Sequence, residues 1–178
     1  RTPVIAQRST FSRHNEDGNL RAQQDVFVMA PPPPGTATLV SQTPTLNLTE
    51  ANSTGAWYGQ SALNPTLPLN LQVTADNQLA IPSSTPTTVS LPLTDLVVIQ
   101  SAEFSLASGQ LTLVASTSDE TSPPVLTATT GNGAAIGTLS GNGAVKTLTT
   151  GLSPLPPATV KVTSAYGGSD TEEVVLVP

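Results

Sequence analysis

Apolar and polar residues alternate over short stretches along most of this chain. The clearest example is Leu67–Thr74, in which leucine or valine occupies every second position. Strict alternation places one face of a strand in a core and the other face in water. Convincing helical spacing of apolar residues is missing, and the 17 prolines would break most helices. The pattern therefore predicts an all-β protein.

Two β-rich runs within Leu93–Ser118 flank a single turn signal. The runs are Leu96–Phe104 and Gln110–Ser116, and Ala107-Ser108-Gly109 lies between them. Gly109 can adopt a positive φ angle, which short hairpin turns often require. We expect a β-hairpin here that opens a second domain.

Short strands at regular spacing predict two domains. Before Pro92 the expected strands include Thr36–Val40, Thr45–Thr49, Ala56–Gln60, Leu67–Thr74, Gln78–Ile81 and Thr87–Leu91. After Asp95 they are Leu96–Phe104, Gln110–Ser116, Val125–Thr129, Ala135–Leu139, Ala144–Thr149, Thr159–Ala165 and Glu172–Val177. Seven strands in about 84 residues approach the immunoglobulin-like sandwich of about 100 residues. The predicted fold is two tandem Ig-like antiparallel β-sandwiches, residues 1–93 and 94–178.

The first 23 residues form a strand-capable arm with a distinct composition. They hold four arginines and the one histidine of the chain. A strand centred on Val4 and Ile5 is expected, then a turn at Asn15–Gly18, and a second strand with Val26, Phe27 and Val28. Pro31–Pro34 cannot donate to a sheet ladder, so they predict a stiff spacer or a sheet edge.

The second half resembles a known family in two segments. PPATVKVTSAYGGSDTEEVVLV, residues 156–177, is similar to the final two strands of bacterial Ig-like modules, and AEFSLASGQLTLVASTSD, residues 102–119, is similar to their first hairpin. The resemblance implies an Ig-like fold in tandem modules of large exported proteins, where such units serve as adhesive or spacer elements. The core cysteine pair and buried tryptophan of antibody-type domains are absent, so no antibody-like binding loop is implied.

Charge and composition exclude some function classes. Only 10% of residues are charged and the net charge is −6, which argues against nucleic-acid binding. No apolar run reaches the ~18 residues of a membrane-spanning helix. Zero cysteines leave the redox compartment open, whereas the Ser/Thr-rich, lysine-poor composition favours an extracellular or cell-surface protein. Arg1-Thr2-Pro3 do not begin a signal peptide, so an exported chain would be a mature or trimmed form.

Catalytic chemistry has few candidate residues. His14 is the one imidazole, which removes most Ser-His and histidine-rich metal schemes. Lys146 and Lys161, the two lysines, fall in predicted strands with apolar neighbours. The sequence therefore predicts a protein without enzymatic activity and without a cofactor.

Acidic residues beside predicted turns offer weak calcium candidates. These are Asp119 and Glu120, and Asp170 and Glu172. Carboxylates and carbonyl oxygens at turns can hold calcium, but none of these groups has the spacing of a calcium loop. Solvated charges that protect sheet edges are the favoured interpretation.

Trp57-Tyr58 is the principal aromatic signal. Neighbouring strand residues point to opposite faces, so one ring should be buried and the other exposed. A sugar-stacking platform is one interpretation, and a core tryptophan with an exposed tyrosine is the favoured one. Asn47-Leu48-Thr49 and Asn52-Ser53-Thr54 match the glycosylation acceptor pattern, which matters only in a secretory host.

These features predict a non-enzymatic extracellular structural or adhesive module with a protein partner, either another copy or a neighbouring module. The arm of residues 1–23, through Val4, Ile5, Val26, Phe27 and Val28, could add a strand to a neighbouring subunit and build a filament. The slightly favoured interpretation is that residues 1–30 are simply the first strands of the first sandwich. Two alternative functions remain. The chain could bind glycans through Trp57 or Tyr58, or it could be a non-catalytic part of a larger secreted protein.

Overall fold

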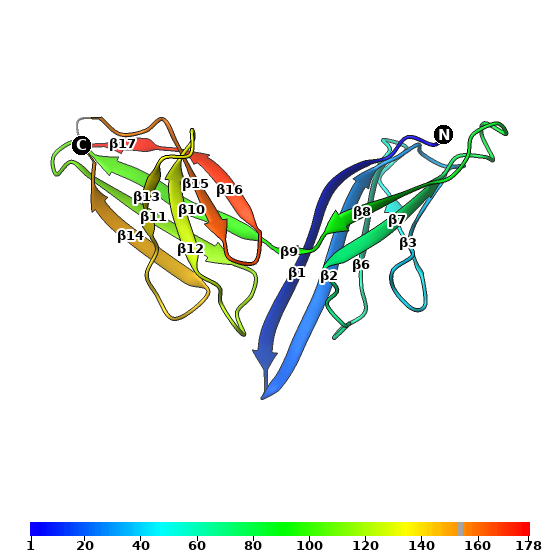
Figure 1. The fold of residues 1–178 in the computed structure, drawn as a ribbon, viewed down its shortest axis with the longest axis horizontal. Coiled ribbons are helices and arrows are strands. Elements are labelled where there is room, and N and C mark those ends of the chain that lie inside the picture. The colour runs from blue at the N-terminus through cyan, green and yellow to red at the C-terminus, as the bar shows by residue number, and fades with distance from the viewer. Residues whose placement is uncertain (153–154) are drawn as a thin grey trace. The chain divides into compact units, whose positions relative to one another are not determined.

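The chain divides into two compact units made of β-strands. The computed structural model describes residues 1–152 and 155–178, and no helix in these ranges is long and apolar enough to cross a membrane. The first unit comprises residues 1–11 and 21–94, and the second comprises residues 12–20 and 95–178 (Figure 1). The described part of the chain is therefore all-β, as the alternation of apolar residues predicts.

The first unit is an Ig-like sandwich. Its strands are β1 (Ile5–Glu16), β2 (Asn19–Met29), β3 (Thr36–Leu39), β4 (Leu46–Asn47), β5 (Thr49–Glu50), β6 (Ala56–Gln60), β7 (Asn70–Asp76), β8 (Thr87–Pro92) and β9 (Thr94–Asp95). The end of β1, the start of β2 and Asp95 of β9 are counted with the second unit. One sheet has the order β5-β6-β2-β1-β9 and the other β4-β3-β7-β8. With β1 as strand A, the sheets are D-E-B-A and C′-C-F-G, which is the immunoglobulin strand order.

The second unit repeats this order. Its strands are β10 (Val97–Ser105), β11 (Gln110–Thr117), β12 (Leu126–Thr130), β13 (Ala135–Thr138), β14 (Val145–Gly151), β15 (Thr159–Ser164), β16 (Ser169–Glu173) and β17 (Val175–Val177). The sheets are β14-β11-β10-β17 and β13-β12-β15-β16, which correspond to E-B-A and C′-C-F-G. The chain thus contains two tandem Ig-like sandwiches.

Each sandwich has a core of its own between its two sheets. The core of the first unit is formed by Val26, Val28, Ala37, Leu39, Leu48, Trp57, Leu71, Val73 and Leu91. The core of the second is formed by Val97, Ile99, Ala102, Phe104, Leu111, Leu113, Ala115, Leu126, Ala128, Leu139, Val160 and Val162. These side chains come from alternate positions of their strands, so the period of two directs them inward.

The last strand segment changes sheet in both units. In the second unit β16 lies beside β15, and after Val174 the chain crosses so that β17 pairs in parallel with β10. In the first unit β8 pairs with β7, and after Leu93 the next segment, β9, joins the sheet that contains β1. This crossing covers part of the edge of each first strand, where unpaired backbone groups would otherwise be exposed.

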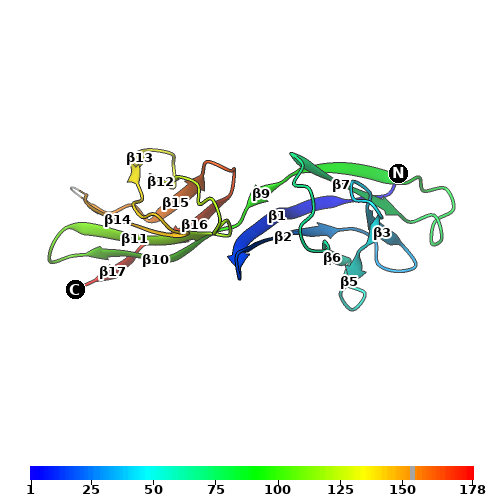
Figure 2. The ribbon, with the colours of Figure 1, turned by 90° about the horizontal axis from the view of Figure 1, so that it is seen from below.

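The predicted hairpin of Leu93–Ser118 is confirmed. β10 and β11 pair from Val97 opposite Thr117 to Ser105 opposite Gln110 (Figure 2). A β-bulge lies between Ile99 and Ser101, and Gly109 closes the turn at a φ of 69°. The turn residue is a glycine because a side chain would strain this backbone conformation.

Several predicted elements differ in the structure. Residues 78–81 form turns after β7 instead of a strand. Pro31–Pro34 lie in the turn that joins β2 to β3 within the first unit, so they are no spacer. The prediction of one strand over Glu172–Val177 is wrong, because the chain changes sheet at Val174. Sequence pattern alone does not distinguish a continuous strand from one that changes sheet.

The alternating segment Leu67–Thr74 is a strand only from Asn70 onward. Leu71 and Val73 are buried, but Leu69 is 87% exposed. Residues 61–69 instead form an irregular connection between β6 and β7. Pro68 lacks the N–H group that a ladder needs, which is consistent with the late start of this strand.

Candidate functional site

The aromatic pair on β6 is divided between the two faces of its sheet. Trp57 is buried in the first core, where its Nε1 donates a hydrogen bond to the Pro31 carbonyl oxygen at 3.3 Å. Tyr58 is 48% exposed on the opposite face. The expected division between a buried and an exposed ring is thus confirmed, and a ligand can reach Tyr58 but not the buried Trp57 ring.

Tyr58 belongs to a row of three side chains across neighbouring strands. Phe27 of β2 lies opposite Tyr58 in the register, and the two rings are stacked with centroids 6.3 Å apart and planes at 24°. The Arg8 guanidinium carbon of β1 lies 4.2 Å from the Phe27 ring centroid. Cation–π and ring-stacking contacts of this kind hold the three side chains together. We call these residues the Arg8–Phe27–Tyr58 row.

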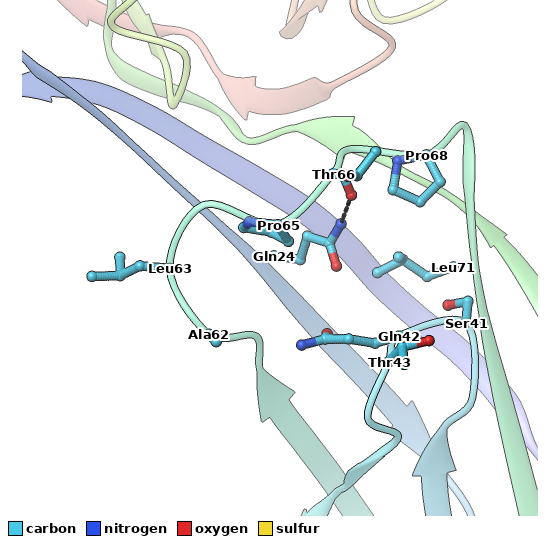
Figure 3. A pocket seen from close by; sticks show the side chains of 10 residues that line it. All are labelled: Gln24, Ser41, Gln42, Thr43, Ala62, Leu63, Pro65, Thr66, Pro68 and Leu71. Atoms are coloured by element: carbon cyan, nitrogen blue, oxygen red, sulfur yellow. Dashed lines mark hydrogen bonds between the residues drawn. The ribbon is translucent and has the colours of Figure 1, made fainter.

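The first unit also contains a cavity of ≈ 410 Å³ (Figure 3). Its walls come from two connecting segments, residues 41–43 and residues 62–68, together with Gln24 of β2 and Leu71 of β7. Gln24 is 3% exposed, and its Nε2 donates to the Thr66 carbonyl oxygen at 3.1 Å. Gln42 has a buried Oε1 without a hydrogen-bond partner. All ten lining residues are uncharged.

The acidic calcium candidates lie in different local environments of the second unit. Asp119 is buried and accepts hydrogen bonds from the Arg13 guanidinium and from the Thr121 and Ser122 backbone. The hydrogen bond that Arg13 donates to Asp119 is the main reason that the pKa of Arg13 is raised above its ordinary value. The Asp119 carboxylate is thus already engaged by a cation of the protein and by backbone N–H groups.

The other acidic candidates are spread over separate segments. The Asp170 carboxylate accepts the backbone N–H of Ile99 at 2.8 Å, while Glu120 and Glu172 are exposed. Across residues 1–152 and 155–178, no three His, Cys, Asp or Glu side chains are placed to hold a metal ion together. The structure therefore brings none of the four candidates into such a group.

The assembly candidates occupy both faces of the first sheet. Val26 and Val28 are buried in the first core, and Val4 packs against it. Phe27 belongs to the Arg8–Phe27–Tyr58 row, and Ile5 is 66% exposed at the start of β1. Residues 5–16 and 19–29 are strands of the five-stranded sheet, in which β1 lies between β2 and β9.

Histidine and lysine are separated from one another. His14 is exposed on β1, with its Nε2 3.7 Å from Glu16. Lys146 is buried on β14 and donates to the Gly141 carbonyl oxygen, whereas Lys161 is exposed on β15. Asn47 and Asn52 of the two glycosylation patterns are both exposed. The structure thus gathers none of these side chains around a common site.

Sequence reasoning did not identify the cavity or the place of Arg8. Gln24, Gln42 and Thr66 come from three segments that the chain brings together only on folding. No motif marks them, since isolated glutamines in a polar chain carry no signal of their own. Arg8 is one of the four arginines in the first 23 residues, and its contact with Phe27 depends on how β1 and β2 pair.

Comparison with known proteins adds little to this description. No family model matches the chain, and no curated protein matches it. One similar solved structure is Dpr2 Ig1-Ig2, crystallised in complex with DIP-Theta Ig1-Ig3. The match covers 98% of this chain and 99% of that chain, at 8% identity and a TM-score of 0.34. Since this likeness is too low to carry a conclusion, the Ig-like assignment rests on strand order.

Proposed function

We propose that the chain is a non-enzymatic extracellular adhesive module, and that the Arg8–Phe27–Tyr58 row is its recognition surface. The partner is a protein, either another copy of the chain or a neighbouring module. The observation that carries this proposal is the stack of exposed Arg8, half-buried Phe27 and exposed Tyr58 on the outer face of the first sandwich.

The composition of the row is that of a protein interface. Arginine, tyrosine and phenylalanine are enriched at interface centres, and tyrosine and arginine are frequent hot spots. The chain has only six aromatic residues, so two of them stacked on a water-facing sheet are unusual. They are not needed for the core, because Val26, Val28 and Trp57 fill the other face of the same strands.

A polar rim borders the row on the same strands. Asp25 and Gln60 form the opposed pair two residues away along β2 and β6, on the same face as Phe27 and Tyr58, and the Gln60 Nε2 donates to Asp25 Oδ1 at 2.9 Å. An aromatic centre with a hydrogen-bonded polar border is the usual arrangement of a binding surface. The Ser/Thr-rich, lysine-poor composition supports the extracellular location of such a module.

Filament growth by strand addition through residues 1–23 is a finer form of this proposal. β1 already has a neighbour on each side, β2 and β9. β9 spans two residues and covers a short part of the β1 edge, so donation of the whole of β1 to another subunit would require it to leave β2 and exchange between copies. The outer face of the sheet needs no such rearrangement, so we place the contact there.

Carbohydrate binding on the same row is the second candidate. Tyr58 offers an open ring on which a sugar could stack, whereas Trp57 is buried. Glycan-array binding by the intact chain that disappears in Tyr58→Ala would favour this role over protein adhesion. An accessory role in a larger secreted protein is compatible with protein binding and with carbohydrate binding by this row.

Tyr58→Ala tests the proposed recognition surface. Beads coated with the chain should cluster, and the substitution should weaken their association by about 30-fold, the effect of removing a hot spot of about 2 kcal/mol. Tyr166→Ala, which changes the other tyrosine at 40% exposure, is the matched control and should cluster like the unchanged chain. Clustering that is equal in both variants would rule the row out as the contact.

A further inference from the structure

We propose that the cavity of the first unit binds a small, neutral, hydroxyl-rich ligand such as a single sugar residue. This site is separate from the Arg8–Phe27–Tyr58 row and does not depend on its function. The cavity, at ≈ 410 Å³, lies within the range of about 300–1,000 Å³ that is usual for small-molecule sites.

The wall formed by residues 61–64 is fixed to β2. The Ser61 N–H donates to the Gln24 carbonyl oxygen at 2.9 Å, and Ser61 Oγ accepts the Gln24 N–H at 2.9 Å. Asn64 makes a matching pair with Ala22, through its backbone N–H at 2.7 Å and its Oδ1 at 3.0 Å. These four bonds hold an irregular segment in place, so the cavity is formed before a ligand arrives.

Two carboxamides supply hydrogen-bonding groups inside this frame. Gln24 uses its Nε2 on the Thr66 carbonyl oxygen, and Figure 3 shows its oxygen turned toward the cavity, on the side of Gln42 and Leu71. The Gln42 Oε1 is buried without a partner in the protein. A buried acceptor that lacks a donor loses its hydration without compensation, and a ligand hydroxyl would remove this penalty.

The rest of the lining selects against charge. No residue around the cavity is acidic or basic, so a buried ionic group would have no counter-charge. Pro65, Pro68 and Leu71 provide an apolar wall, while Ser41 and Thr43 add hydroxyl groups. Ser41 Oγ accepts the Gln72 N–H at 3.0 Å, which leaves its own proton free to donate.

This combination fits a saccharide better than a peptide. A sugar ring presents hydroxyl groups at its rim and C–H groups on its faces, which match the carboxamides and the proline wall. An extended peptide is usually held along a strand edge by main-chain bonds. Most of the cavity lining comes from connecting segments, namely residues 41–43 and 62–68.

The test is a titration of the intact ¹⁵N-labelled chain followed by NMR. The probes are the methyl glycosides of glucose, galactose, mannose and N-acetylglucosamine, each up to about 50 mM, at which a Kd of about 1 mM is saturated. At least one should shift the side-chain amide signals of Gln24 and Gln42 in a saturable way. Sulfate and a Ser/Thr-rich peptide should leave these signals in place.

Gln42→Met keeps the side-chain length and removes the carboxamide, so it should weaken binding at least tenfold. Ala62→Phe, which places a ring in the cavity, should do the same. Gln100→Met, which changes an exposed glutamine on β10 of the second unit, is the matched control and should bind normally. Tyr58→Ala should also keep glycoside binding, so failure of the adhesive proposal would be recognised separately.

The proposal is wrong if no glycoside produces saturable shifts at the two glutamines. It is equally wrong if Gln42→Met, shown by its spectrum to be folded, binds like the unchanged chain. If sulfate or the peptide shifts these signals and the glycosides do not, the proposal of a neutral sugar ligand is wrong and the cavity binds another class of ligand.

Discussion

Single residues in the second unit are placed with little tolerance, and Gly168 is the clearest case. Its N–H donates to Asp95 Oδ1 at 3.0 Å, and the Asp95 carboxylate is buried and also accepts the Thr117 hydroxyl. A Cβ at this position would lie 2.4 Å from the Asp95 carbonyl oxygen and 2.6 Å from Oδ1. The glycine is required here by close approach of two segments and not by a positive φ angle.

Gly168→Ala should therefore destabilise the second sandwich by about 1–3 kcal/mol, the usual effect of overpacking. Urea unfolding followed by far-UV circular dichroism measures the change. Gly143→Ala is the matched control, since a Cβ there meets nothing within 4 Å. Equal midpoints for both variants would show that Asp95 moves away without loss.

At the scale of the element, β7 shows that alternation is not sufficient for burial. Leu69 and Leu71 have the same place in the alternating pattern, yet Leu69 is 87% exposed and Leu71 is 1% exposed. β7 begins between them at Asn70. Leu71 packs in the first core, whereas Leu69 belongs to the connection between β6 and β7.

Leu71→Ala should lower the free energy of unfolding of the first sandwich by about 2–5 kcal/mol, because it opens a cavity in the core. Leu69→Ala should change it by no more than about 0.5 kcal/mol. Trp57 is the one tryptophan of the chain and lies in this core, so its fluorescence during urea unfolding reports the effect. A large loss in Leu69→Ala would contradict its exposed placement.

At the scale of the whole molecule, the chain uses one design twice. Both units have the same order of strands A, B, C, C′, E, F and G, and in both the last segment crosses to the sheet of the first strand. The first strand is thus an interior strand of its sheet and not a loose arm. This arrangement bears directly on assembly through residues 1–23.

Removal of residues 1–23 should unfold the first sandwich, because it deletes all of β1 and the first part of β2. We expect Trp57 emission typical of a solvent-exposed ring, and light scattering that shows aggregates. The full-length chain at the same concentration is the reference. A folded monomer after this deletion would contradict the expectation and would support strand exchange as the route to filaments.

Some parts of the candidate site could be predicted from the sequence and others could not. The opposite environments of Trp57 and Tyr58 follow from the period of two along a strand, which is a local property. The stacking of Phe27 on Tyr58 depends on the register between β2 and β6, which are separated by about 30 residues. The cavity is lined by four separate segments, namely residues 41–43, residues 62–68, β2 and β7, so no local pattern could indicate it.

The sequence by itself determined the all-β class, the tandem Ig-like sandwiches, the hairpin of residues 93–118 and the side of β6 that each aromatic ring faces. These properties depend on alternation and turn residues, which act over a few neighbouring positions. Only the tertiary structure decided that β1 is an interior strand, that Leu69 stays in water, and that Arg8, Phe27 and Tyr58 form a row. Each of these outcomes depends on which strands pair and in which register, and residues distant in the chain decide that pairing together.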